Sequence, residues 1–158
     1  MMGAGKSTVG MQLARLLDVP FHDLDRLIEH SVGHRVQRIF QLFGEETFRK
    51  HETRAIRDLE PGPGVLALGG GAYIREENRP LVHALGPVVW IKVQPAVLLA
   101  RLGRNRAKRP LLAGDDWQEK VLAMMESREP IYAQADLTIE GGDEDPAVVA
   151  ERIREALP

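Results

Sequence analysis

The first eight residues contain a pattern that binds phosphate. Gly3-Ala-Gly-Lys-Ser-Thr8 matches the end of the motif G-x-x-x-x-G-K-[ST] and stands directly before a helical pattern. Glycines in such a loop let backbone N–H groups face phosphate oxygens, a lysine such as Lys6 reaches the β- and γ-phosphates, and a hydroxyl such as that of Ser7 ligates magnesium. The alternative is a glycine-rich helix start with a solvated lysine. We expect a nucleotide-phosphate site at Gly3, Ala4, Gly5, Lys6, Ser7 and Thr8.

The motif lacks its first position, because the first glycine would fall one residue before Met1. The strand that normally precedes and positions such a loop is not in the sequence either. We expect the natural protein to begin about 10 residues earlier, which is enough for one short strand and its turn.

A pair of carboxylates follows a short predicted strand over residues 19–23. Asp23 and Asp25 emerge where an open α/β sheet binds ligands. Two carboxylates at this spacing can have separate roles, one near magnesium and the other near a substrate hydroxyl. Alone, the pattern is more often a solvated turn or a helix cap, but beside a phosphate loop the functional interpretation is favoured.

Three glycines and two arginines suggest a site for a polar acid. Gly69, Gly70 and Gly71 directly follow a buried strand, where they permit unusual backbone angles and the close approach of a ligand. A tight strand-to-helix turn is the alternative, although one glycine would satisfy it. Arg49 and Arg128 lie on separate predicted helices and could clamp a carboxylate, but either alone is typical of a surface cation.

Five cations occur within nine residues, at Arg101, Arg104, Arg106, Lys108 and Arg109. The cluster suits a nucleic-acid patch, a solvated loop, or a lid over a transferring phosphoryl group. Beside a phosphate loop, the lid is favoured. We expect a mobile segment over residues 103–116, hinged at Gly103 and Gly114.

The elements that must hold these residues alternate between strands and helices. Strands are predicted at 19–23, 64–68, 87–93 and 136–139, and helices at 7–17, 24–32, 36–43, 45–59, 77–85, 96–102, 117–133 and 146–157. This alternation is typical of an α/β domain with a parallel sheet. We therefore expect one domain over residues 1–158.

Composition excludes several classes of protein. With 44% hydrophobic and 28% charged residues, the chain should fold rather than stay disordered. A net charge of -2 gives no global attraction to nucleic acid or anionic lipid, and the absence of cysteine excludes disulfides and thiolate chemistry. Because no apolar run approaches the ~20 residues of a membrane span and no secretory signal is visible, we expect a cytoplasmic protein without membrane or nucleic-acid partners, and a monomer.

The segments GAGKST, DLD, FRKHE, LGGGA and RPLL, in this order, closely resemble the shikimate kinases, a family of the P-loop nucleoside-monophosphate-kinase-like group. The match runs from residue 1 to about 140. The resemblance implies a three-layer α/β/α fold with a parallel sheet of five strands, of which the first is absent here. It also implies an ATP-dependent phosphotransferase that phosphorylates the 3-hydroxyl of shikimate on the route to chorismate and the aromatic amino acids.

The resemblance also implies roles for the candidate residues. ATP and Mg²⁺ would be held by Lys6 on the phosphates, by Ser7 and Asp23 on the metal, by Arg101 on adenine and by Arg109 from the lid. Shikimate would be held by Asp25 on its hydroxyls, by Arg49 and Arg128 on its carboxylate, and by the backbone of Gly69, Gly70 and Gly71. Catalysis would depend on Asp25 as the base, with Lys6 and Arg109. The segment 140–146 departs from the family pattern, and we expect it to contact adenine through backbone atoms.

Two other functions remain open. A gluconate-type kinase also uses a phosphate loop and phosphorylates a carboxylated polyol. A non-catalytic ligand sensor is the alternative from another class, because shikimate-kinase-like domains also occur fused to helix-turn-helix regulators. The complete set of catalytic candidates argues against the sensor.

Overall fold

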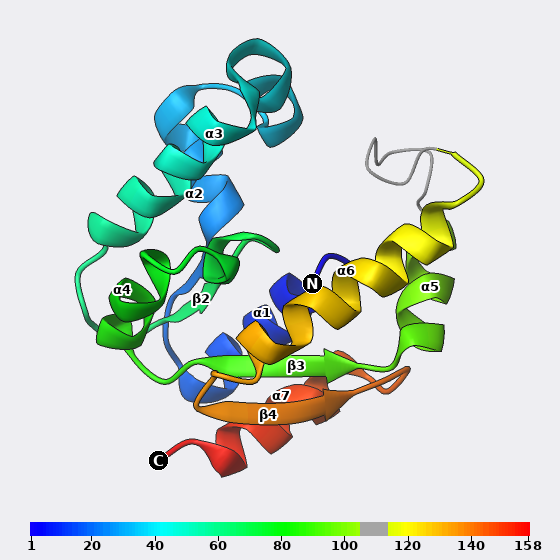
Figure 1. The fold of residues 1–158 in the computed structure, drawn as a ribbon. Coiled ribbons are helices and arrows are strands. Elements are labelled where there is room, and N and C mark those ends of the chain that lie inside the picture. Colours follow the sequence, from blue (N-terminus) through cyan, green and yellow to red (C-terminus); the bar gives the residue numbers. More distant parts are fainter. Residues whose placement is uncertain (105–113) are drawn as a thin grey trace.

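A computed structural model describes residues 1–104 and 114–158, and it confirms the alternation of helices and parallel strands (Figure 1). The helices are α1 (Lys6–Leu17), α2 (Leu24–Val32), α3 (Val36–Arg57), α4 (Asn78–Leu85), α5 (Pro95–Arg104), α6 (Trp117–Tyr132) and α7 (Pro146–Ala156). The strands are β1 (Phe21–Asp23), β2 (Val65–Ala67), β3 (Val89–Val93) and β4 (Leu137–Gly141). A short 3-10 turn, η1 (Ala72–Ile74), was not predicted.

The four strands form two parallel pairs. β1 pairs with β2, with Phe21 opposite Val65, and β3 pairs with β4, with Val89 opposite Leu137. Within the described ranges, β2 and β3 are not hydrogen-bonded to each other and no strand precedes α1. These ranges therefore contain four of the five strands that the resemblance implies.

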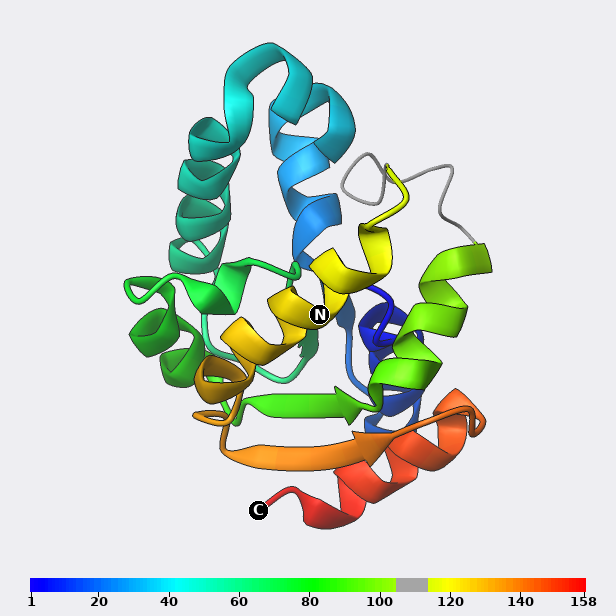
Figure 2. The same cartoon turned by 45° about the vertical axis from the view of Figure 1, so that its right-hand side comes forward.

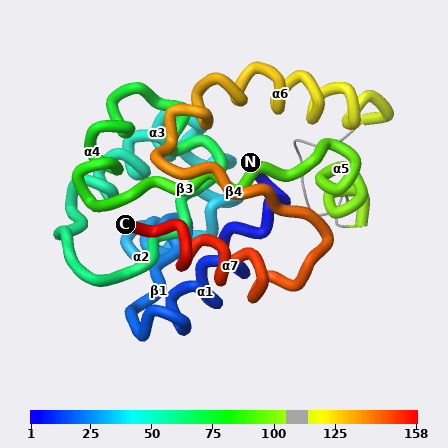
Figure 3. The backbone as a smooth tube through the Cα atoms, turned by 90° about the horizontal axis from the view of Figure 1, so that it is seen from below, coloured from blue at the N-terminus to red at the C-terminus, as the bar shows by residue number. Residues whose placement is uncertain are grey.

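Helices cover both faces of the strands. On one face α1 and α7 lie side by side (Figure 3), and their contact is built from Val9, Leu13, Val149, Ala150 and Ile153. The opposite face carries a cluster that includes Leu24, Ile28 and Ile56 and receives Tyr132 from α6. Neighbouring strand residues point to opposite faces, so Val65 joins the first cluster and Leu66 the second. The predicted three-layer α/β/α arrangement is confirmed.

A glycine breaks the long helix α3 at the position where the sequence separates two predicted helices. Gly44 has φ 79°, a left-handed value that glycine adopts without a steric penalty. The second half of α3 then returns along the molecule and buries Phe48 and Ile56 (Figure 2). Arg49, which neighbours Phe48 in this second half, is thereby brought to the inner side of α3.

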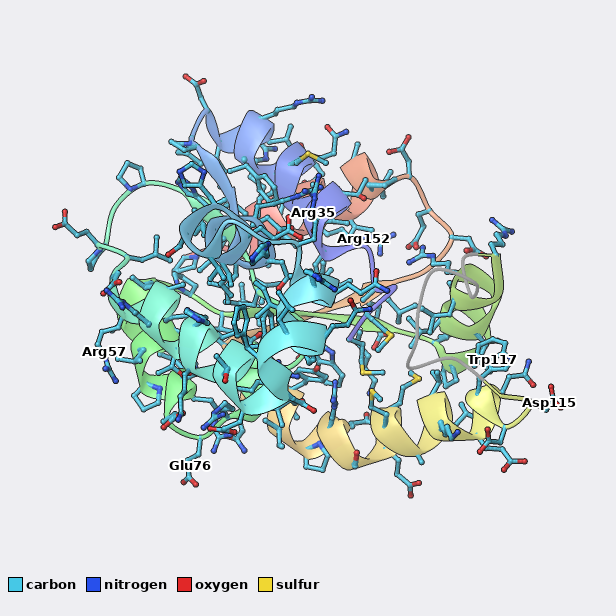
Figure 4. The ribbon with its side chains drawn as sticks, turned by 90° about the horizontal axis from the view of Figure 1, so that it is seen from above. Arg35, Arg57, Glu76, Asp115, Trp117 and Arg152 are labelled. Atoms are coloured by element: carbon cyan, nitrogen blue, oxygen red, sulfur yellow. The ribbon has the colours of Figure 1, made fainter. Side chains whose placement is uncertain are left out.

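The predicted lid lies mostly outside the described residues, which end at residue 104 and resume at 114. Gly103, predicted as a hinge, lies inside α5. Trp117, in the first turn of α6, packs against α5 near Gly103 (Figure 4). Across residues 1–104 and 114–158, no helix combines the length and the apolar character needed to cross a membrane.

Candidate active site

The phosphate loop is shaped by glycines with left-handed backbone angles. Gly3 has φ 75° and Gly5, the N-cap of α1, has φ 84°. A Cβ at Gly3 would also lie 2.9 Å from Leu102 Cδ2, so the position needs glycine for space as well as for conformation. The Ala4 side chain is buried against α5, which leaves its backbone as the part that can meet a ligand.

Lys6 and Ser7 open α1 and point to different partners. Lys6 Nζ donates a 2.6 Å hydrogen bond to the carbonyl oxygen of Met1, which folds the lysine back over the loop. Ser7 Oγ donates to Asp23 Oδ2 at 2.6 Å. A hydroxyl and a carboxylate oxygen are ligands that Mg²⁺ prefers, so these two oxygen atoms fit the magnesium site expected here. Thr8 is exposed one residue further along the helix.

Asp23 also caps the N-terminus of α2. Its Oδ1 accepts from the backbone N–H of Asp25 at 3.1 Å and from that of Arg26 at 3.4 Å. These bonds cap the helix and satisfy donors that have no partner inside it. The capping interpretation and the functional one are therefore compatible, because the two carboxylate oxygens face different groups.

Asp25 lies in a half-buried, negatively charged environment. A Cβ at Gly69 would lie 2.8 Å from Asp25 Oδ1 and 2.8 Å from Glu52 Oε1, so both carboxylates crowd the same glycine. Burial raises the pKa of Asp25, and the charge of Asp23 raises it further, while Lys6 and Arg49 oppose the shift. The raised pKa suits a group that must take up a proton.

Arg49 is held by carboxylates and aromatic rings. Its guanidinium donates to Glu52 Oε2 at 2.6 Å and to Glu45 Oε1 at 2.9 Å. The same group lies 5.5 Å from the ring centroid of Phe48 and 6.0 Å from that of Phe40. Burial alone would lower the pKa of Arg49, but the bonds to Glu52 and Glu45 raise it, so the arginine stays charged.

Glu52 is a residue of this site that the sequence-based assignment of roles left out. It is fully buried, and its Oε1 has no hydrogen-bond partner within the described structure. Burial raises the pKa of Glu52, while Arg49 opposes that shift. Its spacing of three residues from Arg49 on one helix was the available signal.

The glycine segment 69–71 lies at the centre of these side chains. Arg49 covers Gly71, where a Cβ would lie 2.7 Å from the guanidinium carbon. Arg128 Nη1 and Tyr132 Oη both donate to the carbonyl oxygen of Gly70, at 3.2 and 2.7 Å. The structure therefore brings together Asp25, Arg49, Gly69, Gly70, Gly71 and Arg128, which come from four separate stretches of sequence.

The prediction of unusual backbone angles in this segment is wrong. None of Gly69, Gly70 and Gly71 is among the glycines with positive φ, and Gly71 has φ -110° and ψ -11°. Gly69 and Gly71 are needed because the side chains of Asp25 and Glu52 at the first, and of Arg49 at the second, leave no room for a Cβ. Asn78 steadies the end of the segment, because its Nδ2 donates to the carbonyl oxygen of Ala72 at 2.9 Å.

Arg101 joins the phosphate loop to the segment after β4. Its guanidinium donates to the carbonyl oxygen of Gly3 at 3.5 Å and to that of Gly142, and its Nε lies 3.9 Å from Asp143 Oδ1. This contact places segment 140–146 beside the loop, where the sequence predicted an adenine contact. Arg109 lies outside the described residues.

The parallel strands, the glycine loop at the start of α1 and the Ser7–Asp23 pair define the class of P-loop phosphotransferases. A family model described as shikimate kinase matches residues 2–158, and the chain belongs to this family.

Relatives and solved structures agree with this assignment. The chain is 44% identical to a shikimate kinase of Cereibacter sphaeroides over 99% of this chain and 79% of that protein. It is 43% identical to one of Bradyrhizobium diazoefficiens over 99% of this chain and 76% of that protein. A structure of shikimate kinase from Acinetobacter baumannii in complex with shikimate superposes with a TM-score of 0.91 at 36% identity, covering 98% of this chain and 87% of that one.

Proposed function

We propose that the chain transfers the γ-phosphate of ATP to the 3-hydroxyl of shikimate and releases ADP. The observation that carries this proposal is the convergence of Asp25, Arg49, Arg128 and the glycine segment 69–71 beside the phosphate loop. Two arginines suit the carboxylate of an acid, and a carboxylate with a raised pKa suits its hydroxyl. Membership of the shikimate kinase family supports the same substrate.

The nucleotide and its metal meet residues at the other end of the site. Lys6 and the backbone of residues 3–5 would bind the phosphates at the N-terminus of α1, where the helix dipole favours negative charge. Ser7 and Asp23 would hold Mg²⁺, which supplies charge neutralisation on the phosphate oxygens. Arg101 would contact adenine, and Arg109 would reach the phosphates from the segment after α5.

The chemistry of the chain's own residues follows from their positions. Asp25 takes the proton of the acceptor hydroxyl, whose oxygen bonds to the γ-phosphorus as the bond to the bridging oxygen of ADP breaks. Arg49 and Arg128 hold the acid so that the hydroxyl stays in line, and positioning of this kind supplies most of the catalysis in phosphoryl transfer. We further propose that the chain acts in the cytoplasm as a monomer, without nucleic-acid or membrane partners.

An assay of ADP release with separate acceptors tests this proposal. We expect release with MgATP and shikimate, none with MgATP and gluconate, and a loss of about 10²-fold or more in Asp25→Asn. Turnover of gluconate without turnover of shikimate would favour the gluconate-type kinase. Binding of shikimate without ADP release in the wild-type chain would favour the ligand sensor.

A further inference from the structure

The carbonyl oxygen of Gly70 receives two hydrogen bonds from one helix face. Tyr132 Oη lies 2.7 Å from it and Arg128 Nη1 lies 3.2 Å from it. The two donors are four residues apart on α6, so they stand one above the other on the same side of the helix. The Tyr132 hydroxyl makes the shorter of the two hydrogen bonds, and it is a neutral donor.

The hydrogen bonds to the Gly70 carbonyl fix the peptide between Gly70 and Gly71. The neighbouring carbonyls are held locally, because Gly69 accepts from Ala72 N at 3.2 Å and Gly71 accepts from Ile74 N at 3.1 Å. Gly70 is held from α6 instead. In a trans peptide the C=O and the following N–H point in opposite directions, so fixing the Gly70 carbonyl also fixes the direction of the Gly71 N–H. Glycine has no side chain that restricts its backbone angles, so the restraint on this peptide must come from outside the segment.

Arg128 and Tyr132 differ in how firmly they hold this carbonyl. In the proposed function Arg128 engages the substrate carboxylate, and this role competes with its 3.2 Å bond to the Gly70 carbonyl. Tyr132 is buried, with 8% of its surface exposed, and its ring lies 6.0 Å from that of Trp90. Burial raises the pKa of Tyr132, so its hydroxyl keeps its proton and remains a donor.

We propose that Tyr132 is a positioning residue that holds the Gly70 carbonyl, so that the glycine segment keeps its binding orientation while Arg128 engages the substrate carboxylate. This inference rests on the proposed function. It assigns to Tyr132 an effect on the affinity for the acid, and none on the nucleotide side of the site.

The test compares two substitutions that each remove one buried phenolic hydroxyl. Tyr132→Phe keeps the ring against Trp90 and removes the bond to Gly70, together with the hydrogen bond between the Tyr132 hydroxyl and Arg128. Tyr73→Phe is the matched control, because Tyr73 has 4% of its surface exposed and its Oη lies 2.9 Å from His83 Nε2, on α4. Each variant loses one phenolic hydroxyl whose hydrogen bond measures 2.7 or 2.9 Å, so the thermal midpoint reports the structural part of each change.

We expect Tyr132→Phe to raise the KM for shikimate about threefold to tenfold, which corresponds to the net value of one such hydrogen bond. The KM for ATP and kcat should stay within about twofold of the wild type, and Tyr73→Phe should leave the KM for shikimate unchanged within the same limit. An unchanged KM for shikimate in Tyr132→Phe, an equal rise for ATP, or an equal rise in Tyr73→Phe overturns the inference.

The wild-type chain separates this failure from failure of the proposed function. If the wild type turns over shikimate and Tyr132→Phe behaves like it, the inference fails and the proposed function stands. If the wild type does not turn over shikimate, the proposed function fails and the inference fails with it.

Discussion

The close contact between Gly71 and Arg49 makes Gly71→Ala a specific perturbation of the candidate acid site. The backbone of Gly71, with φ -110° and ψ -11°, lies in a region that alanine can adopt, so the main effect of the change is the new Cβ. The new Cβ would lie 2.7 Å from Arg49 Cζ. Carbon atoms in ordinary contact are about 3.5–4.0 Å apart, so the guanidinium must move by about 1 Å.

Arg49 cannot make this movement without losing its anchors. Its bonds of 2.6 Å to Glu52 and 2.9 Å to Glu45 fix both ends of the guanidinium. A misplacement of about 1 Å in a positioning group can cost about 10²-fold in rate, which corresponds to about 2.7 kcal/mol. We therefore expect kcat/KM for shikimate to fall about 10²-fold in Gly71→Ala, mainly through KM, as measured by initial rates of ADP release.

Gly10→Ala is the control for a clash of similar size outside the acid site. Its Cβ would lie 2.8 Å from Phe21 Cε2, in the contact between α1 and β1. We expect it to change the midpoint of unfolding and to leave the KM for shikimate within about twofold of the wild type. A KM for shikimate in Gly71→Ala within that limit, or an equal rise in Gly10→Ala, would show that Gly71 does not set the position of Arg49.

Three further predictions concern other parts of the molecule. Burial raises the pKa of Asp25, and its protonated form cannot take a proton, so kcat/KM should fall as the pH falls through that raised pKa. A pH profile in which kcat/KM falls only at the ordinary carboxyl pKa of about 4 would contradict this. Ser7→Ala should raise the Mg²⁺ concentration needed for half-maximal activity, since it removes one of the two side-chain oxygens proposed to hold Mg²⁺, and an unchanged Mg²⁺ titration would remove Ser7 from the proposed metal site. Asp18 ends α1 with φ 52°, a left-handed backbone angle that strains a residue with a side chain. Asp18→Gly should therefore raise the free energy of unfolding by about 0.5–1 kcal/mol in urea titrations, and a lower urea midpoint would contradict this strain.

The local features of the fold could be predicted from the sequence because their causes are local. Hydrophobic spacing and the proline at position 20 place the end of α1, and the glycine at position 44 separates two helical patterns. The phosphate loop and Asp23 were recognised from residues that lie within a few positions of one another. Each of these depends on contacts inside one element or between an element and the turn that follows it.

The arrangement around the glycine segment could not be predicted, because it depends on long-range packing. Tyr132 bonds to Gly70 across 62 residues, and nothing in its local pattern distinguishes it from an ordinary core tyrosine. Three consecutive glycines after a strand indicate a ligand contact, and the sequence alone suggests unusual backbone angles as part of the reason. The physical reason is steric, since Asp25 and Glu52 crowd Gly69 while Arg49 covers Gly71. A close approach between distant elements leaves no periodic signal in a single sequence.

Arg49 is proposed to bind the carboxylate of the acceptor acid, and calorimetry with shikimate and its methyl ester tests this role. Arg49→Ala should weaken the binding of shikimate about 10- to 100-fold, as expected for the loss of a charged hydrogen bond. The methyl ester, which carries no carboxylate, should bind the wild type and Arg49→Ala with affinities within about threefold of each other. An equal loss of affinity for both ligands, or no loss for shikimate, would contradict the assignment.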